Sequence, residues 1–487
     1  VRVGMKAVFA PEGSYIPGLS MTLQATKIRG IKSSGMLLSE RELSLSDEHD
    51  GILELDPKSK IGRDIYEQIN KSDPVIEISI TPNRSDALGV RGIARDLSAA
   101  DIGKLKPLKA AKIIGKYNIQ KEIKINKDAE KNIYASFRLI KNVRNCDSPK
   151  WLKNRLEAIG LRPINALVDV TNYLTYDLNR PLHVFDYDKI NKGLEIRKAK
   201  AGEKILALDD KEYELSRSHT IFSDDNHPES IAGIIGGKRT GCDYDTVNVL
   251  VESATWDKIN IANTGRELNI NSDARYRNER GIDNEFNDSG LDKAVEMIKE
   301  ICGGEISNTK SVGKPVNRQE KINFNLDEVS RLLGVSFKKS EINNILTGLG
   351  FSLSEKNNKI EVTIPSWRHD ISENACIVEE IMRIKGTDNI KPIPLKKSIG
   401  VSSKKINRAQ KIRFNIKRVL ASRGMMETVS YSFISDKIAK LFYQVNDDLR
   451  LLNPISTELN VMRQLLMPSL LLSVKKNLDK GLSLIHI

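Results

Sequence analysis

The sequence has 487 residues, which corresponds to about three to five domains at roughly 100–200 residues per domain. Its 39% hydrophobic and 29% charged residues are typical of a soluble globular protein, and without an apolar run of about 18 residues we expect no membrane-spanning helix and a cytoplasmic location. The net charge of +13 suits a polyanionic partner such as nucleic acid, although lysine is spread along the whole chain, so biased base composition explains the charge equally well.

The first part of the chain changes its pattern twice. Residues 1–66 alternate short apolar runs with Gly and Pro, which is typical of a small β-barrel, and because the pattern begins in mid-course we expect its first strands to be missing. Residues 75–80 predict a strand, and the turn Pro82–Asp86 predicts the N-cap of a helix that runs through Ala99. The Lys-rich residues 101–130 predict a linker and one strand.

A long mixed α/β region follows, up to about residue 315. Ser148-Pro149 predicts the start of a helix with Pro at the first helical position, and Gly160 predicts its end. Another helix is predicted at 289–301, ended by Gly303-Gly304. Strands are predicted at 167–174, 219–223 and 247–252.

Residues 319–390 predict a compact unit in which two helices precede a β-hairpin, as in a helix-turn-helix-like or winged fold. The predicted order is strand 320–325, helix 326–333, helix 339–349, strand 351–355, strand 359–364 and helix 372–385. Beyond it, residues 405–480 predict a long helix and strands near 427–433. Residues 482–487 resemble the translated end of a transposon used for sequencing libraries, so we expect a non-native scar, with a short apolar strand as the alternative.

The four cysteines stand far apart and form no CxxC pair. They are Cys146, Cys242, Cys302 and Cys376. This spacing argues against a zinc site and a disulfide framework, so we expect reduced and mostly buried thiols.

One candidate metal motif is Ser366–Asp370, followed on the next predicted helix by Glu379 and Glu380. Clustered carboxylates offer the hard oxygen ligands that Mg²⁺ prefers. In the simpler interpretation, which the spacing by itself favours, Asp370 caps the helix and Glu379 is solvated.

The runs Asp169–Tyr173 and Arg180–Asp186 hold Asn172 and His183, which can position a water molecule for ester hydrolysis. A structural hydrogen bond is the commoner role of a single His after Pro-Leu.

Two other runs are open to two interpretations each. The glycines of Ile231–Gly237 let the backbone approach a ligand closely, or simply form a tight turn. The arginines and acids of Asn271–Asp283 predict either contacts with a phosphate backbone or a solvated ion-pair network.

Six runs stand in a fixed order along nearly the whole chain. They are Ile78–Arg84, Val168–Tyr173, Pro181–His183, Asn278–Asp283, Pro365–Arg368 and Asn453–Ser456. In this order they resemble the β subunit of bacterial phenylalanine–tRNA ligases, truncated at both ends.

The resemblance implies an α+β multidomain chain. The expected domains are the C-terminal part of an OB-type tRNA-binding barrel at 1–66, a connecting segment and linker at 67–124, a mixed α/β B3/B4 editing domain at 125–316, a winged-helix-like B5 domain at 317–392, and part of an inactive class II synthetase-like domain at 400–481.

The resemblance also implies a function shared with a partner chain. An α₂β₂ tetramer is expected, in which the α subunit uses ATP to attach phenylalanine to tRNA(Phe). The β subunit binds tRNA and hydrolyses misacylated Tyr-tRNA(Phe).

Family residues carry over to matching positions of this sequence. The implied editing residues are Asn172, His183 and Glu252, with a pocket formed by Thr171, Gly233, Gly236, Ser272 and Ala274. Glu252 would accept the hydroxyl of tyrosine, and Ser272 stands where some members have Thr. The implied ligands of a Mg²⁺ ion shared with the α subunit are Asp370, Glu379 and Glu380. The fourth ligand position holds Cys376, a poor Mg²⁺ ligand, so weaker binding is expected.

Two functions of other classes stay open. One is a non-catalytic RNA-binding or scaffold module with a silent editing pocket. The other is a free-standing deacylase that acts on mischarged tRNA in trans; the synthetase-like segment 425–470 argues against it, because such an enzyme needs no surface for an α subunit.

Overall fold

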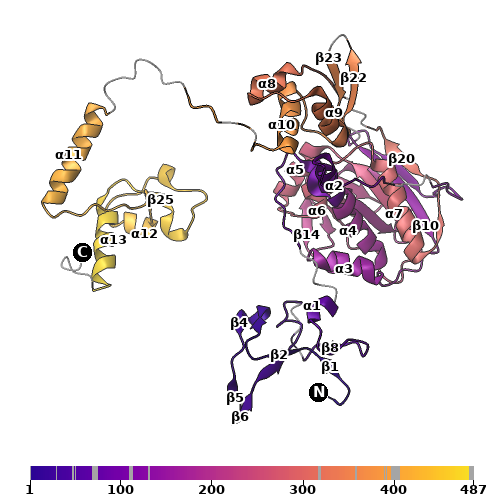
Figure 1. The fold of residues 1–487 in the computed structure, drawn as a ribbon, viewed down its shortest axis with the longest axis horizontal. Helices are drawn as coiled ribbons and strands as arrows, with labels where there is room; N and C mark the ends of the chain where they lie inside the picture. Colours follow the sequence, from indigo (N-terminus) through magenta and orange to yellow (C-terminus); the bar gives the residue numbers. More distant parts are fainter. Residues whose placement is uncertain are drawn as a thin grey trace. The chain divides into compact units, whose positions relative to one another are not determined.

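The structure is a computed structural model. It describes residues 2–28, 30–45, 49, 51–68, 75–108, 113–129, 132–315, 320–356, 359–388, 390, 392–395 and 406–481. Residues 482–487, where a scar is expected, lie outside the described residues. The chain folds as two compact units, residues 1–391 and 392–487 (Figure 1), and each is described by itself.

The N-terminal residues form short strands that pair two by two. The elements are β1 (Lys6–Ala7), β2 (Phe9–Pro11), β3 (Tyr15–Ile16), η1 (Pro17–Leu19), β4 (Met21–Thr22), β5 (Thr26–Ile28), β6 (Ile31–Ser33), β7 (Gly35–Leu37), β8 (Glu54–Leu55) and α1 (Ile65–Gln68). The pairs are β1–β8, β2–β7, β3–β4 and β5–β6, around a small core that includes Val8 and Ile16. A β-rich segment is therefore present, while its assignment as an OB-type barrel stays a prediction.

The strand predicted at 75–80 is wrong. These residues pair with none of the described strands, and Val75 and Ile76 are 64% and 77% exposed. An apolar alternation becomes a strand only where a neighbour accepts its backbone hydrogen bonds. The following helix, α2 (Val90–Ala99), forms as expected but is preceded by the 3₁₀ turn η2 (Ser85–Leu88) and capped by the backbone of Gly89, so the predicted side-chain cap is also wrong.

Two sheets and a layer of helices make up the region that follows. The first sheet has the order β11 (Leu182–Asp186), β18 (Val249–Thr255), β10 (Tyr134–Lys141) and β19 (Glu305–Ile306), with β20 (Lys310–Gly313) also paired to β10. The second has the order β17 (Ile235–Gly236), β16 (Pro228–Ile231), β15 (Thr220–Ser223), β12 (Gly193–Lys198) and β9 (Glu122–Ile125). A separate hairpin joins β13 (Glu203–Leu206) to β14 (Glu212–Leu215).

Five helices belong to the same region. They are α3 (Lys150–Ala158), α4 (Ala166–Leu178), α5 (Lys258–Glu267), α6 (Asp273–Asn278) and α7 (Asn287–Cys302). Helices α3, α4 and α7 lie together and cover one face of the first sheet (Figure 1). The predicted Pro start of α3 is off by one position, because Pro149 is the N-cap residue, whereas α7 ends at Gly303 as predicted.

Successive side chains of β18 point alternately into two hydrophobic cores. Val249 and Val251 pack on the helices, whereas Leu250 and Ala254 face the second sheet. Between the sheets, the rings of Phe137 and Phe222 meet edge to face at 6.1 Å. Burying a side chain of this size stabilises the folded chain by about 1.5–3 kcal/mol. Because such cores are closely packed, the layer between the sheets holds the side chains that project into it in fixed positions.

The strand predicted at 167–174 is wrong, because this segment is part of helix α4. Its buried side chains recur at helical spacing, with Leu167, Val170, Leu174 and the neighbouring Thr171 on the covered face. The side chain of Asn165 accepts a hydrogen bond from the Val168 amide and caps the helix. The β-branched residues of this run favour a strand locally, but the helical period and the cap decide its structure.

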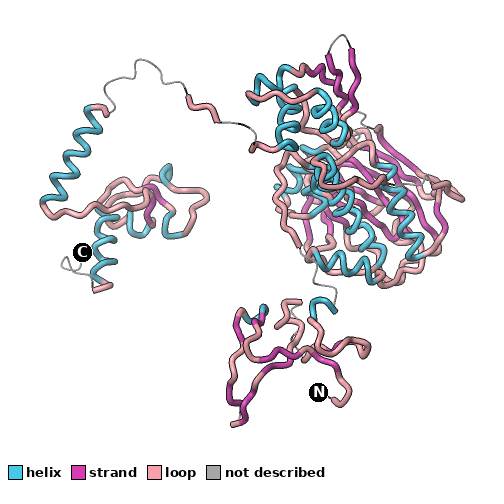
Figure 2. Tube along the Cα trace, in the orientation of Figure 1, coloured by secondary structure: helices cyan, strands magenta, loops and turns pink. Residues whose placement is uncertain are grey.

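The predicted elements between 320 and 385 are confirmed within one or two residues. They are β21 (Lys321–Phe324), α8 (Asp327–Leu333), α9 (Lys339–Gly348), β22 (Ser352–Lys356), β23 (Lys359–Thr363) and α10 (Asn374–Lys385). The hairpin β22–β23 joins β21 in one sheet beside the three helices (Figure 2).

The second unit begins its described part at residue 406. Its elements are α11 (Arg408–Ser422), β24 (Phe433–Ile434), α12 (Asp436–Ala439), η3 (Asp447–Leu449), η4 (Thr457–Leu459), β25 (Val461–Met462) and α13 (Met467–Leu478). The long helix is confirmed, whereas the strands predicted near 427–433 reduce to the two residues of β24, paired with β25. The class II-like assignment stays a prediction.

Candidate active site

His183 and Glu252 face each other on neighbouring strands. They are directly opposed in the antiparallel pairing of β11 with β18, so both side chains project from the same face of the sheet. That face is the one that contacts the second sheet, because Phe185 and Leu250, two residues away on each strand, lie in the inter-sheet core. The ring of Phe185 packs edge to face against His183 at 4.4 Å.

Gly236, on strand β17 of the second sheet, packs closely against His183. A Cβ atom at Gly236 would lie 2.3 Å from Cε1 and 2.8 Å from Nε2 of His183, so only glycine leaves room for the imidazole. The run Ile231–Gly237 forms the tight turn between β16 and β17, in which Gly233 has a φ of +68°. The simpler interpretation of this run is therefore confirmed, and the turn also packs against His183.

Two side chains from α6 fix the glycine turn. Ser272 caps α6 and its hydroxyl donates to the carbonyl of Ile234 at 2.6 Å. The Asn278 amide donates to the carbonyl of Gly233 at 2.9 Å. The structure thus brings together His183, Glu252 and Gly236 directly, and connects Gly233 and Ser272 to them through the turn.

The three remaining predicted residues lie on helices. Thr171 and Asn172 belong to α4, which packs against β11, and Ala274 lies in the first turn of α6. The hydroxyl of Thr171 donates to the carbonyl of Val168 within its own helix. Within the described residues, no hydrogen bond joins Asn172 to His183 or Glu252, so its catalytic role stays a prediction.

Burial changes the ionisation of both central groups. It lowers the pKa of His183 to about 4, so the imidazole is neutral at pH 7. Its Nε2 atom is shielded from solvent and has no hydrogen-bond partner among the described residues, although the residue as a whole is only half-buried. Burial also raises the pKa of Glu252 to about 8, against the opposing charge of Arg180, so the acid form predominates at pH 7.

Arg180 belongs to this environment although the sequence assigned it no role. It is completely buried two residues before β11, and one guanidinium nitrogen donates to the carbonyl of Ala254 on β18 at 3.5 Å. Its position inside the run Arg180–Asp186 was the available signal, but nothing in the sequence shows that this arginine is buried.

The arginines of Asn271–Asp283 are paired with acids. Arg275 binds Glu279 at 3.1 Å, and Arg277 binds Asp273 at 2.8 Å. The run therefore forms an ion-pair network, and these contacts favour that interpretation over a phosphate grip.

The predicted Mg²⁺ ligands do not form a cluster. Arg368 binds Asp370 at 2.8 Å and Glu380 at 2.7 Å, while Glu379 is exposed. No group of three His, Cys, Asp or Glu side chains among the described residues is arranged to hold a metal ion. Because arginine already neutralises two of the three carboxylates and Cys376 is a poor ligand, these residues do not fit Mg²⁺ as they stand, and its binding here stays a prediction.

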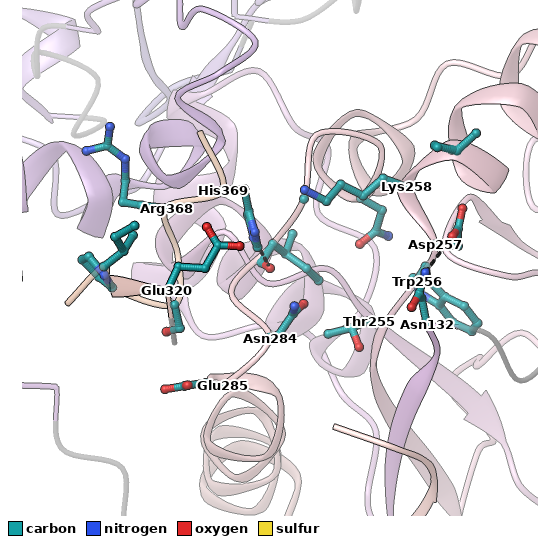
Figure 3. Close-up of a pocket in the computed structure, with 17 residues that line it drawn as sticks. Asn132, Thr255, Trp256, Asp257, Lys258, Asn284, Glu285, Glu320, Arg368 and His369 are labelled. Carbon is teal, nitrogen blue, oxygen red and sulfur yellow. Dashed lines mark hydrogen bonds between the residues drawn. The ribbon is translucent and has the colours of Figure 1, made fainter. Parts of the chain in front are cut away.

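A cavity of about 610 Å³ lies away from His183, between residues 255–285 and 364–369. Lys258 and His369 line it (Figure 3), a Cβ added at Gly281 would meet both side chains, and His369 Nε2 lies 2.8 Å from the carbonyl of Ile282. Of the described residues that line it, none is a predicted editing residue, and its mixture of cations and acids singles out no ligand.

The structure supports no reactive role for the cysteines. All four are free; Cys302 is buried and the other three are half-buried. Burial raises the pKa of Cys242 and of Cys302 to about 12, which makes both thiols unreactive at neutral pH.

Comparisons with known proteins match nearly the whole chain. Family profiles match residues 131–303 as a B3/4 domain, 322–387 as a tRNA synthetase B5 domain and 394–487 as a phenylalanyl-tRNA synthetase beta chain CLM domain. Proteins named phenylalanine–tRNA ligase beta subunit are 46% identical over 99% of the chain in Mesorhizobium japonicum and in Brucella abortus. The chain belongs to the phenylalanine–tRNA ligase β subunit family.

The chain spans about 60% of the length of these family relatives. The match supports a mixed α/β chain with B3/4, B5 and CLM domains, and a role of the family in phenylalanyl-tRNA synthesis. An N-terminal fragment of the phenylalanyl-tRNA synthetase beta subunit from Pyrococcus horikoshii aligns with a TM-score of 0.34 and 16% identity, over 63% of this chain and 85% of that one. A score this low supports no statement about the fold. No helix among the described residues is long and apolar enough to cross a membrane.

Proposed function

We propose that the chain works as the β subunit of a phenylalanine–tRNA ligase and hydrolyses misacylated Tyr-tRNA(Phe) at the His183–Glu252 site. The observation that carries this proposal is the pairing of a half-buried imidazole with a buried carboxyl on adjacent strands, with Gly236 packed on the imidazole. Burying a carboxyl costs folding free energy, which a hydrogen bond from a ligand would offset.

The site has the chemistry expected of an editing pocket that accepts tyrosine and rejects phenylalanine. Tyrosine differs from phenylalanine by one hydroxyl, and a site that requires this group rejects the correct product. The hydroxyl would hydrogen-bond Glu252, which makes no hydrogen bond among the described residues, and phenylalanine would leave it unpaired at a cost of about 1–3 kcal/mol. The neutral His183 ring can then orient a water molecule at the ester, with Asn172 as a second orienting group and Thr171, Ser272 and Ala274 near the substrate.

The proposal extends to partners. An α subunit would supply ATP-dependent activation and attach phenylalanine, in an α₂β₂ tetramer located in the cytoplasm. The family match and the net charge of +13 support binding of tRNA(Phe) by this chain. A silent RNA-binding scaffold and a free-standing deacylase are the competing functions.

The test is hydrolysis of Tyr-tRNA(Phe) by the 487-residue chain paired with an α subunit. His183→Ala should lower the rate by about 100-fold or more, because an orienting base contributes about 10²–10⁴-fold. Glu252→Gln should reduce the preference for Tyr-tRNA(Phe) over Phe-tRNA(Phe) by roughly 10- to 100-fold, because it changes the side chain that would hydrogen-bond the tyrosine hydroxyl.

Matched controls are the exposed His227→Ala and Glu214→Gln in the same region, which should keep the wild-type rate. A chain that clears Tyr-tRNA(Phe) equally well after both substitutions would remove the assignment of editing to the His183–Glu252 site, and an unsubstituted chain that clears none would favour the silent scaffold. Hydrolysis that needs no α subunit and no association with it would favour the free-standing deacylase.

A further inference from the structure

Asn278 is a buried residue whose side chain makes one hydrogen bond among the described residues. It is the last residue of α6 and is 4% exposed. Its Nδ2 atom donates to the carbonyl of Gly233 at 2.9 Å, and its Oδ1 atom has no hydrogen-bond partner among the described residues. A substitution that removes the amide therefore removes this contact and breaks no other described hydrogen bond of the side chain.

Side chains from α6 and β16 hold three consecutive carbonyl groups of the glycine turn. The donors and their acceptors are Asn278 to Gly233 at 2.9 Å, Ser272 to Ile234 at 2.6 Å and Ser230 to Ile235 at 3.1 Å. Ser230 lies on β16, the strand that enters the turn, whereas Asn278 and Ser272 reach the turn from α6. The position of the turn therefore depends on α6 as well as on its own strands.

Gly233 also packs against a row of aromatic rings that leads back to His183. A Cβ atom at Gly233 would lie 2.6 Å from Cδ1 of Trp256. The edge-to-face pairs that follow, with the distances between ring centroids, are Trp256–Phe222 at 5.6 Å, Phe222–Phe185 at 5.6 Å and Phe185–His183 at 4.4 Å. Because Gly236 at the end of the turn packs on the imidazole, these contacts form a closed path that starts and ends at His183.

Helix α6 is itself fixed, so a hydrogen bond from it can hold the turn in place. The guanidinium of Arg277 lies 4.5 Å from the ring centroid of Tyr176 on α4 and donates to the carbonyl of Leu88 at 3.2 Å. Arg277 also pairs with Asp273 at 2.8 Å. Cation–π and charge-assisted contacts of a buried arginine are strong, so the residue next to Asn278 anchors α6 on α4.

We propose that Asn278 is a positioning residue for hydrolysis: by holding the carbonyl of Gly233, it keeps the glycine turn against His183 and fixes the point from which the imidazole orients a water molecule. The inference rests on the proposed function. Asn278 makes no hydrogen bond to His183 or Glu252 among the described residues, so it acts through the turn. Position matters because a displacement of about 1 Å can reduce a rate about 100-fold.

The first test is hydrolysis of Tyr-tRNA(Phe) by the 487-residue chain paired with an α subunit. Asn278→Leu keeps the branched shape of the side chain but removes the donor, and Asn278→Ala removes both. Each should lower kcat by about 10-fold and change KM by less than about twofold, because a displaced imidazole affects the chemical step and not substrate binding. Asn263→Ala, an exposed asparagine of α5, is the control and should keep the wild-type kcat.

The second test observes His183 directly and needs no hydrolysis. The ¹³C-histidine-labelled full-length chain has six histidines, and His183→Ala assigns the signal. The Cε1–H group of His183 is the part of the ring that Gly236 approaches, and the ring of Phe185 packs against the imidazole, so its resonance responds to movement of the turn. Both Asn278 variants should move this resonance by more than its linewidth, whereas Asn263→Ala should leave it unchanged.

A double substitution shows whether Asn278 acts through the turn. Gly236→Ala by itself displaces His183, so adding Asn278→Ala to it should lower kcat by less than about threefold more, as expected for residues that act through one contact. If the two residues acted independently, the second substitution would again lower kcat by about 10-fold.

The outcomes separate this inference from the proposed function. In an Asn278 variant that thermal unfolding shows to be folded, an unmoved His183 resonance overturns the role of Asn278. A wild-type kcat in such a variant overturns it as well, and so does a full further loss in the double variant. A moved resonance in a chain whose unsubstituted form hydrolyses no Tyr-tRNA(Phe) overturns the editing proposal, yet supports the positioning of His183. A moved resonance with a lowered kcat and an unchanged KM supports both.

Discussion

Replacing Gly236 with alanine is expected to reduce hydrolysis of Tyr-tRNA(Phe) by about 100-fold while the chain stays folded, since displacing a catalytic group by about 1 Å costs this much. The added Cβ would lie 2.3 Å from Cε1 of His183 and 3.0 Å from Cδ1 of Leu208. The imidazole cannot move away freely, because the ring of Phe185 packs against it at 4.4 Å. Because the φ of Gly236 is not in the left-handed region, the expected loss comes from displacement of His183 and not from backbone strain.

Gly103→Ala is the matched control for this substitution. A Cβ there would meet no atom within 4 Å, and the backbone is not in the left-handed region. Rates of deacylation and thermal unfolding of both variants, each paired with an α subunit, provide the measurement. Wild-type hydrolysis by the Gly236→Ala chain would show that His183 does not act from the position that the structure gives it.

Replacing Glu380 with alanine is expected to destabilise the region around α10 by about 3 kcal/mol, the lower end of the range for breaking a buried ion pair. Its carboxylate is 3% exposed and binds Arg368 and Arg383, both at 2.7 Å. The loss stays near the lower end because Arg368 keeps Asp370 and Arg383 keeps Asp96 as partners, at 2.8 and 2.7 Å.

The neighbouring Glu379→Ala is the control, because Glu379 is exposed and should change stability by no more than about 0.5 kcal/mol. Urea denaturation and hydrogen exchange of the amides of α10 give the two free energies of unfolding. Equal effects of the two substitutions would contradict the network and would favour a shared role of both carboxylates, such as the metal site that the family resemblance implies.

The sequence by itself determined most of the elements between 320 and 385 and the position of the motifs. Alternation, glycine and proline mark strands and turns locally, so β21, β22 and β23 and the three helices around them could be placed within one or two residues. The motif runs were sufficient to indicate the family, and the family resemblance implied that His183, Glu252 and Gly236 belong to one site. This worked because strand period and motif order are properties of short segments.

Tertiary structure alone decided the rest. The pattern of 75–80 fits a strand, but these residues lack a partner strand among the described residues. The ionisation of His183 and Glu252, and the pairing of Glu380 with arginines instead of a metal cluster, follow from burial and from neighbours distant in sequence. His183 and Glu252 come together across 68 intervening positions, because the sheet pairs β11 with β18. The energy of a charge depends on its surroundings in three dimensions, and these are set only when the chain has folded.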